Sequence, residues 1–371
     1  MKIKNIILLI SVILVLFACT VNKPHLDCSF IEIKKNETDI NFKYLAIVPS
    51  HITLNSKDSS IHLFFQNAQT LQIFSYKLSR DTIMPISEIN FHTPEFFFRY
   101  YIVSTDSIYM FYQDSWLLTL KNGKGDMVKT YEIDHKFIPV AIPPMNLMVN
   151  NSKFLLGHSS QTLGVGEREN RLKYYNTIKP ILKLSLKDTI LTCKTISKFP
   201  DEYINSGYDY YDYYPSACFG KEGKICVSFG ANDYLYLYQD STLLLKKEVK
   251  SNFIDKFNPY PDDKVYDMLY LKNYLAEEPK YSRVIFDPYE NVYYRIVKHR
   301  GSKTKENTVG NSWSVIILDT ELNVLAEENI DSKFRAEIFI PTPFGIVMAQ
   351  ESVNHPGNTV LTLAKIKRDD K

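Results

Sequence analysis

Apolar and polar positions along this chain repeat in one pattern: a short apolar segment, a polar turn and a second apolar segment. The pattern is clearest in Tyr109–Leu118 and Leu235–Leu244, which share Tyr-Gln-Asp-Ser between two apolar runs. Gln-Asp-Ser is turn chemistry, and apolar runs of this length flanked by turn residues are typical of β-strands. The pattern therefore predicts the same β-hairpin at two places in the chain.

Weaker copies of the hairpin occur at three further places, Gln72–Ile83, Leu182–Leu191 and Val315–Leu325. A second pair of strands precedes most of the hairpins, for example Asn146–Gly157 and Ser282–Ile296. Four strands in units of roughly 35–55 residues are typical of propeller blades. Read in this way, the chain divides into six units, at about 43–90, 95–134, 138–198, 214–250, 281–330 and 335–367.

The last unit shows only three strands, while a lone apolar strand, Ser29–Lys34, remains near the N-terminus. If this strand pairs with the last unit, it removes an exposed edge and closes the ring. We therefore predict an all-β fold, a six-bladed β-propeller of four-stranded antiparallel blades. Two stacked β-sandwiches are the alternative, but they leave the recurring hairpin unexplained. Helical patterns are confined to Asp263–Glu278 and Glu167–Lys173.

The first residues combine Lys2 and Lys4 with an apolar run from Ile6 to Ala18. This combination is typical of a secretory signal peptide, and the run is shorter than the roughly 18–20 residues that span a bilayer. The string Leu16-Phe17-Ala18-Cys19 resembles the bacterial lipobox, whose thiol is diacylated before cleavage; an ordinary signal peptide does not explain a cysteine there. We expect a signal peptide at 1–18, a lipidated tether at 19–27 and the propeller domain at 28–371.

Residues near Cys19 also bear on localisation. Thr20 is not the Asp that resembles an inner-membrane retention signal, and no acidic run resembling a surface-export signal follows. We expect the chain in the cell envelope, anchored to the outer membrane through Cys19 and facing the periplasm.

Composition narrows the partners. The chain has 26 Tyr and 22 Phe but 13 Gly, a bias that favours sheet. Of its 44 basic residues, Lys2 and Lys4 leave with the signal peptide, so 42 basic residues face 42 acidic ones. A neutral, evenly mixed surface argues against nucleic acid and against an electrostatic membrane patch.

Three strings add a family likeness: Phe137–Met145, Ser228–Tyr236 and Phe286–Arg295. Together with the lipobox and the six units, they resemble a family of uncharacterised lipoproteins of gut-type Gram-negative bacteria, which are similar to TolB-like six-bladed β-propellers. The resemblance covers nearly the whole mature chain. It implies a fold and an envelope location, and it supplies no catalytic residue.

Cys218 and Cys226 flank the string Phe219–Ile225. If Lys221–Gly223 forms a three-residue hairpin loop, the two cysteines face each other across the strands. An extracytoplasmic compartment allows a disulfide between them, and two buried free thiols are the alternative.

The most unusual segment is Tyr203–Tyr214, between the third and fourth units. Its tyrosines and aspartates, Tyr208, Asp209, Tyr210, Tyr211 and Asp212, are candidate contacts for a ligand or partner, because tyrosine suits both sugar stacking and protein interfaces. The alternative is that these residues plug the end of the propeller.

Arg283 and Arg295 alternate with apolar residues in the fifth unit. On inner strands, their planar guanidinium groups could bind an acidic or hydroxyl-rich ligand in the central channel. The alternative is an arginine paired with an aspartate between blades, which holds the ring together.

The usual catalytic motifs, such as a nucleophile elbow, a zinc-protease helix or a phosphate loop, are absent from the sequence. We expect no metal, no cofactor and no assignable catalytic residue. The sequence favours a non-enzymatic binding or scaffold module whose partner is an envelope protein or a glycan. The alternatives are a glycan- or small-molecule-binding propeller and, third, a periplasmic hydrolase or lyase.

Overall fold

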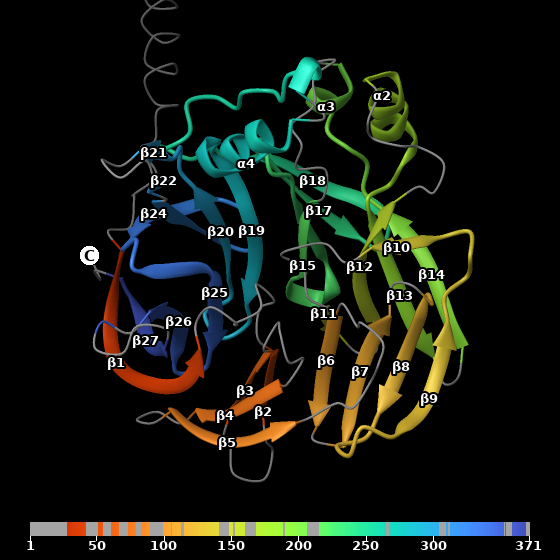
Figure 1. Ribbon diagram of the computed structural model, residues 1–371. Helices are drawn as coiled ribbons and strands as arrows, with labels where there is room; N and C mark the ends of the chain where they lie inside the picture. The colour runs from red at the N-terminus through yellow and green to blue at the C-terminus, as the bar shows by residue number, and fades with distance from the viewer. Residues whose placement is uncertain are drawn as a thin grey trace, which may run out of the picture.

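Strands dominate the computed structural model of the chain (Figure 1). The structure describes residues 28–41, 51–54, 61–66, 73–78, 83–89, 99–104, 106–112, 115–140, 148–150, 153–159, 168–187, 190–205, 215–264, 267–303, 309–310, 312–351, 353 and 358–368. Its sheets are arranged around a common centre, and the strands of each sheet follow one another outward from that centre. The fold is an all-β propeller with four-stranded antiparallel blades.

Five sheets have four strands each in the described part of the chain. Sheet 1 contains β2 (His51–Leu54), β3 (Ile61–Gln66), β4 (Ile73–Leu78) and β5 (Ile83–Ile89). Sheet 2 contains β6 (Arg99–Ser104), β7 (Ser107–Tyr112), β8 (Leu117–Lys121) and β9 (Met127–Glu132). Sheet 4 contains β15 (Ser216–Phe219), β16 (Ile225–Ser228), β17 (Tyr234–Gln239) and β18 (Thr242–Glu248). Sheet 5 contains β19 (Lys280–Asp287), β20 (Val292–Lys298), β23 (Trp313–Leu318) and β24 (Val324–Ile330). Sheet 6 contains β25 (Phe334–Thr342), β26 (Gly345–Glu351), β27 (Asn358–Arg368) and β1 (Cys28–Asn41).

The prediction of six four-stranded blades is wrong in its count, because the third unit is a five-stranded sheet. Sheet 3 contains β10 (Ile138–Val140), β11 (Met148–Asn150), β12 (Lys153–Ser159), β13 (Ile181–Lys187) and β14 (Ile190–Ile196). Its inner strand is divided into β10 and β11, which both pair with β12. The intervening sequence contains Pro143 and Pro144, and proline has no N–H for a ladder hydrogen bond.

The predicted hairpins are confirmed: Tyr109–Leu118 lies in β7–β8 and Leu235–Leu244 in β17–β18. The N-terminal strand also pairs where the sequence places it. β1 runs antiparallel to β27 as the outermost strand of sheet 6, with Cys28 opposite Arg368. Sheet 6 thus joins the two ends of the described chain.

Burial falls from the middle strands of a sheet to its outer strand. In sheet 5, every residue of β23 is buried, since neighbouring sheets cover both of its faces. In the outer strands β9 and β18, most residues are exposed or half-buried. The core is therefore divided among the junctions of adjacent sheets, with separate clusters between sheets 2 and 3, 3 and 4, 4 and 5, and 5 and 6.

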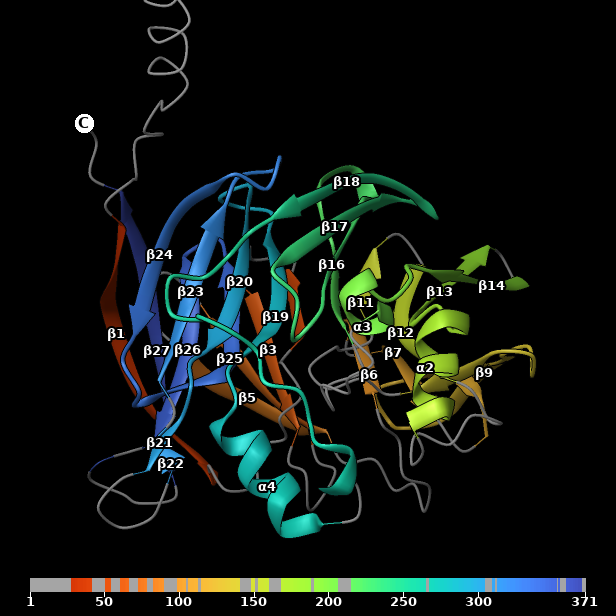
Figure 2. The same cartoon turned by 90° about the horizontal axis from the view of Figure 1, so that it is seen from above.

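The helices occupy connections between strands, and both sequence-predicted segments contain one. They are α2 (Arg168–Thr177), α3 (Asp201–Asn205) and α4 (Met268–Glu277), with one-turn 3-10 helices at Lys221–Gly223 and Asp262–Lys264. A two-stranded ribbon, β21 (Ser302–Lys303) and β22 (Val309–Gly310), extends from sheet 5. Each α-helix lies in a connection that leads out of a second or fourth strand, and this places all three on one face of the propeller, where α4 stands at the lower edge of Figure 2.

Candidate functional site

Most of the residues singled out in the sequence are not described by the structure. Cys19 and the group Tyr208, Asp209, Tyr210, Tyr211 and Asp212 lie outside the described residues. The other four, Arg283, Arg295, Cys218 and Cys226, meet at the junction of sheets 4 and 5. This junction is therefore where the sequence predictions and the structure can be compared.

Cys218 and Cys226 face each other in the register of β15 and β16, as the hairpin predicts. Residues 221–223 form the connecting turn, with positive φ at Glu222 and Gly223. Both thiols are free and fully buried. Burial raises the pKa of Cys226 to about 12 and that of Cys218 well above its usual range, so neither is a reactive thiolate in the fold. A bond between them stays a prediction.

Arg295 lies on β20, fully buried, and reaches across to sheet 4. Its Nε donates to Ser228 Oγ at 3.1 Å, and its Nη1 donates to the carbonyls of Asp233 at 3.0 Å and Val249 at 2.7 Å. Its Nη2 donates to the carbonyls of Asn232 at 2.6 Å and Tyr234 at 3.4 Å. These contacts use all five N–H groups of the guanidinium. Arg295 therefore joins two sheets, and its hydrogen-bond partners are four carbonyls and a serine hydroxyl rather than an aspartate side chain.

A tyrosine covers the face of this guanidinium. The carbon of the Arg295 guanidinium lies 3.3 Å from the ring centre of Tyr281, whose hydroxyl donates to Asp233 Oδ1 at 2.6 Å and accepts from Ser251 N at 3.0 Å. Burial lowers the pKa of Arg295 to about 10, so the side chain is still charged at neutral pH. The charge is balanced by carbonyl dipoles and the aromatic face.

Arg283 lies on β19, the inner strand of sheet 5, and is also buried. It follows a bulge between Tyr281 and Arg283 in the pairing of β19 with β20. Arg283 interacts with other residues of the protein. The candidate role of Arg283 in ligand binding therefore stays a prediction.

Tyr203, the first residue of the tyrosine-rich segment, is fully buried. It lies in an aromatic cluster with Tyr175, Phe199 and Phe229, and its hydroxyl accepts from Ala231 N at 2.9 Å. This start of the segment fastens α3 to sheet 4. The remainder of the segment lies outside the described residues, so its role as a plug or as a contact surface stays a prediction.

Residues 251–279, here called the arm, connect β18 to β19 and carry α4. Glu327 holds its first residues: Ser251 Oγ donates to Oε1 at 2.6 Å and Asn252 N donates to Oε2 at 2.7 Å. Asp267 begins α4 as an N-cap whose Oδ1 accepts from Tyr270 N at 2.9 Å. These contacts fix the start of the arm and the start of its helix.

Two basic residues, Lys298 at the end of β20 and Arg300 just after it, hold the other end of the arm. Lys298 Nζ donates to three carbonyls at the C-terminal end of α4, those of Leu275, Ala276 and Glu278, at 2.7, 2.7 and 3.0 Å. Arg300 Nη1 forms an ion pair with Glu278 Oε1 at 2.6 Å. A cation at a helix C-terminus and a carboxylate beside a guanidinium are both favourable. Lys298 and Arg300 therefore hold the C-terminal end of α4 against sheet 5.

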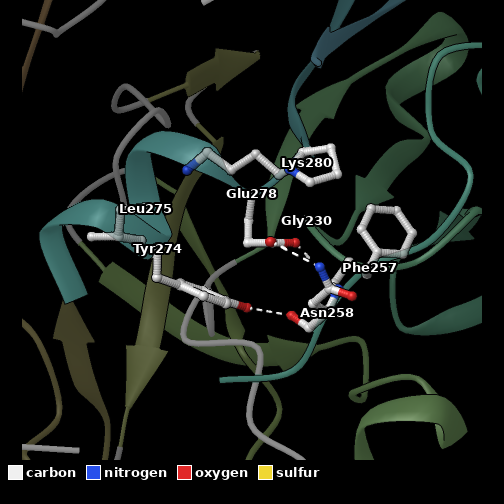
Figure 3. Close-up of a pocket in the computed structure, with 9 residues that line it drawn as sticks. Gly230, Phe257, Asn258, Tyr274, Leu275, Glu278 and Lys280 are labelled. Carbon is white, nitrogen blue, oxygen red and sulfur yellow. Dashed lines mark hydrogen bonds between the residues drawn. The ribbon is translucent and has the colours of Figure 1, made fainter. Parts of the chain in front are cut away.

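A pocket opens where the arm crosses the junction of sheets 4 and 5 (Figure 3). Its cavity volume is about 20 Å³, and the hollow amounts to about 340 Å³ when the adjoining open space is counted with it. The lining residues come from the turn after β16, from the arm and from the start of β19: Gly230, Ala231, Phe257, Asn258, Tyr274, Leu275, Glu278, Pro279 and Lys280. Aromatic and aliphatic surface thus surrounds a small number of polar groups, as in many small-molecule sites.

The polar groups of the pocket converge on Asn258, as Figure 3 shows. Asn258 Nδ2 donates to Glu278 Oε1 at 2.9 Å, and Tyr274 OH donates to the Asn258 carbonyl at 2.7 Å. The backbone of the other wall is fixed too, since Tyr281 N donates to the Gly230 carbonyl at 2.9 Å. Arg295 binds the carbonyls just beyond Gly230, so it stabilises one wall of the pocket.

Sequence reasoning missed the pocket, because its residues come from segments distant in the chain. The only signal in the sequence was the helical pattern predicted at Asp263–Glu278, which contains Tyr274, Leu275 and Glu278 of the lining. Within the described ranges, no group of three His, Cys, Asp or Glu side chains could hold a metal ion. Among the same residues, no helix is long and apolar enough to cross a bilayer.

Comparison with known proteins gives the family. The model of the family described as "Domain of unknown function (DUF4221)" matches residues 37–329, and this chain belongs to that family. A search of the curated proteins finds no match.

Solved structures support the fold. A DUF4221 member from Bacteroides vulgatus is 17% identical with a TM-score of 0.68, over 92% of this chain and 99% of that chain. An exported protein of Bacteroides fragilis is 10% identical with a TM-score of 0.48, over 94% and 97%. Virginiamycin B lyase from Staphylococcus aureus is 12% identical with a TM-score of 0.41, over 90% and 99%. The first shares the fold; the TM-scores of the other two are too low to carry an argument.

Proposed function

We propose that this chain is an exported binding module whose small-molecule ligand binds in the pocket under α4. The observation that carries the proposal is the pocket itself: a concave site at a sheet junction, lined by aromatic and aliphatic side chains with a few fixed polar groups. The walls are held by Arg295, Lys298 and Arg300, so they are formed before a ligand arrives. A preformed site avoids the cost of ordering loops on binding.

The anchor belongs to the same proposal. A lipid on Cys19 would hold the chain at the outer membrane, facing the periplasm, on a tether of nine residues that reaches at most about 30 Å. β1 is an outermost strand and runs opposite to the inner strands, whereas α4 directly precedes the inner strand β19. Cys28 and α4 therefore lie on opposite faces, and the pocket would point away from the membrane.

The same proposal includes a closed ring of TolB-like type. β1 would be the strand that seals the ring. The pairing of β1 with β27 supports this arrangement.

A protein partner is the second candidate, and the surface of α4 favours it. Met268 is 72% exposed and Leu269 is 70% exposed on its first turn, and Leu275 is 41% exposed on its last. Exposed apolar side chains grouped on one helix are typical of an interaction surface. In this case the pocket would be the edge of a wider protein interface.

A thermal-shift screen of the Ser29–Lys371 fragment tests the ligand proposal, with a panel of oligosaccharides, cell-wall fragments and nucleosides. A ligand at 100 times its Kd stabilises a protein by about 2.7 kcal/mol. Leu275→Trp is expected to fill the pocket and abolish the shift. Leu269→Trp is the matched control, since it puts the same side chain on the same helix outside the pocket lining.

The outcomes separate the two candidates. A shift that only Leu275→Trp abolishes supports the pocket. No shift with any compound, together with cross-linking of a protein in intact cells that Leu269→Trp weakens, supports the protein partner. Protease added to intact cells tests the location, since degradation of the protein would contradict the periplasmic orientation.

A further inference from the structure

His299, which directly follows β20, is the centre of a hydrogen-bonded chain that the pocket does not use. The residue is 8% exposed, and its ring stacks on Phe253 with centroids 4.4 Å apart and an interplanar angle of 19°. Its Nδ1 lies 3.1 Å from Ser312 Oγ, and its Nε2 lies 2.9 Å from Ser314 Oγ. Its backbone N–H donates to the Ser312 carbonyl at 2.9 Å. The imidazole is therefore held in one orientation.

Glu327, the last group of this series of hydrogen bonds, fixes the position of each proton. Ser314 Oγ lies 2.9 Å from Glu327 Oε1, and an ionised carboxylate can only accept, so Ser314 donates to it. Ser314 Oγ must then accept from His299 Nε2–H. Burial lowers the pKa of His299, against the opposing effect of the Glu327 charge, so at neutral pH the ring carries one proton. Nδ1 has a free lone pair and accepts the hydroxyl proton of Ser312.

This order of groups is that of an activated nucleophile. A hydroxyl donates to a neutral imidazole, whose second nitrogen is oriented by a hydrogen-bonded acid. Here a serine lies between the base and the acid. Ser312 is exposed at the start of β23, so a molecule from solvent can reach its Oγ. Phe253, which is 39% exposed, adds apolar surface beside the imidazole.

We propose that Ser312 is a nucleophile with His299 as its general base, and that the substrate class is a small carboxylic ester. In the first step Ser312 Oγ bonds to the acyl carbon and its proton passes to His299 Nδ1. The acyl–oxygen bond then breaks, and the leaving alkoxide takes that proton as an alcohol. Water attacks the acylated serine by the same route and releases the acid. An ester fits because its leaving group needs one proton, which the imidazole supplies.

A fluorophosphonate probe tests the nucleophile directly on the Ser29–Lys371 fragment. Attack of a serine oxygen on phosphorus releases fluoride and leaves a stable adduct that peptide mass spectrometry locates. We expect Ser312 to react at least about 100-fold faster than Ser332, an exposed serine in the turn before β25, because general-base catalysis contributes about 10²–10⁴-fold. Ser312→Ala is expected to remove the fast adduct, and the matched control Ser332→Ala is expected to retain it.

A second variant separates activation from exposure. His299→Asn is expected to slow labelling of Ser312 about 100-fold while the hydroxyl stays exposed. An adduct on Ser312 from an activated ester such as p-nitrophenyl acetate would support the acyl step. The proposal is overturned if Ser312 in the unmodified, folded protein reacts no faster than Ser332. This comparison needs no variant, so a His299 variant that fails to fold leaves the test intact.

Discussion

The junction between sheets 2 and 3 and the junction between sheets 4 and 5 are held by different chemistry. Between sheets 2 and 3 the contacts are apolar, with Phe111, Leu118, Phe154 and Leu182 fully buried. Between sheets 4 and 5 a buried Arg295 adds five hydrogen bonds and a tyrosine face to an apolar cluster. The pocket lies at the second junction.

This difference indicates why the pocket lies beside a junction that is held by directional hydrogen bonds. Apolar packing is non-directional and tolerates exchange of one hydrophobic side chain for another of similar volume. A guanidinium bound to carbonyls fixes the course of the backbone, because each hydrogen bond has a required geometry. Arg295 holds residues 232–234 in this way, next to the pocket wall at Gly230 and Ala231.

The two tryptophans allow sheets 2 and 5, one from each junction, to be observed separately. Trp116 lies in the hairpin of sheet 2, where its ring centroid is 4.7 Å from that of His135. Trp313 is buried on β23 of sheet 5, with Nε1 donating to the Phe334 carbonyl at 2.9 Å. Since the chain has 2 Trp in total, Trp116→Phe leaves one fluorescent probe in sheet 5 and Trp313→Phe leaves one in sheet 2.

The largest expected effect is from Arg295→Met, which removes the charge and all five donors. The carbonyls of Asn232, Asp233 and Val249 then lose a buried partner, and we expect a loss of about 3–5 kcal/mol in the free energy of unfolding. Urea unfolding followed through Trp313 measures it. A loss below about 1 kcal/mol would show that packing alone holds this junction.

Gly220→Ala is expected to cost about 1–3 kcal/mol at the same junction. A Cβ at Gly220 would lie 1.8 Å from the hydroxyl oxygen of Tyr293 on β20, so the ring or the backbone must move. Tyr293→Leu removes the clash. The test is a double-mutant cycle by thermal unfolding. If Gly220→Ala destabilises the Tyr293→Leu variant as much as it destabilises the unmodified chain, the steric explanation is wrong.

Phe154→Leu tests the apolar junction and is expected to cost less, about 1–1.5 kcal/mol. Phe154 is fully buried and meets the ring of Tyr109 edge to face at 5.1 Å, so leucine loses that contact and leaves a small cavity. The matching variant at the other junction is Arg295→Lys, which is also a conservative substitution. We expect it to lower the free energy of unfolding more, because lysine has three donors and no planar fork. The denaturant midpoints of the two variants measure this difference. A lower midpoint for Phe154→Leu than for Arg295→Lys would contradict the prediction.

The smallest expected effect is on pH dependence. Burial lowers the pKa of His299 from 6.5, while the Glu327 carboxylate, the charged group that faces it, opposes the shift. The unfolded chain therefore takes up a proton that the folded chain does not, and stability is expected to fall as pH drops below about 6.5. Urea unfolding at pH 7.5 and 5.5 should show less pH dependence in His299→Gln than in the unmodified chain. An identical change in both would remove His299 as the cause.

How far the sequence predicted the fold can be judged from particular strands. The Tyr-Gln-Asp-Ser hairpins and the pairing of the N-terminal strand follow from local alternation and turn chemistry, and the structure contains them. The division of the third unit into β10 and β11 was not predicted, because it depends on where β12 finds partners.

The candidate site shows the opposite balance. The sequence singled out Arg295 because a charged residue alternates with apolar ones, but it could not tell a ligand contact from a clamp. That distinction depends on carbonyls 46–63 residues earlier in the chain. The pocket and the Ser312–His299–Ser314–Glu327 chain were both missed, since strand pairing and not sequence spacing brings their residues together.

The sequence by itself determined the strands, the hairpin turns, the helical insertions and the fold class, because these depend on neighbours within a few residues. Tertiary structure decided which side chains are buried together, which charges bind each other and where a cavity remains. Lys298, Arg300 and Glu278 illustrate this difference between what the sequence determined and what tertiary structure decided. Their charges are plain in the sequence, but only the fold places Arg300 against Glu278 and Lys298 at the end of α4. Long-range pairing sets these distances, and distance sets both hydrogen bonding and electrostatic energy.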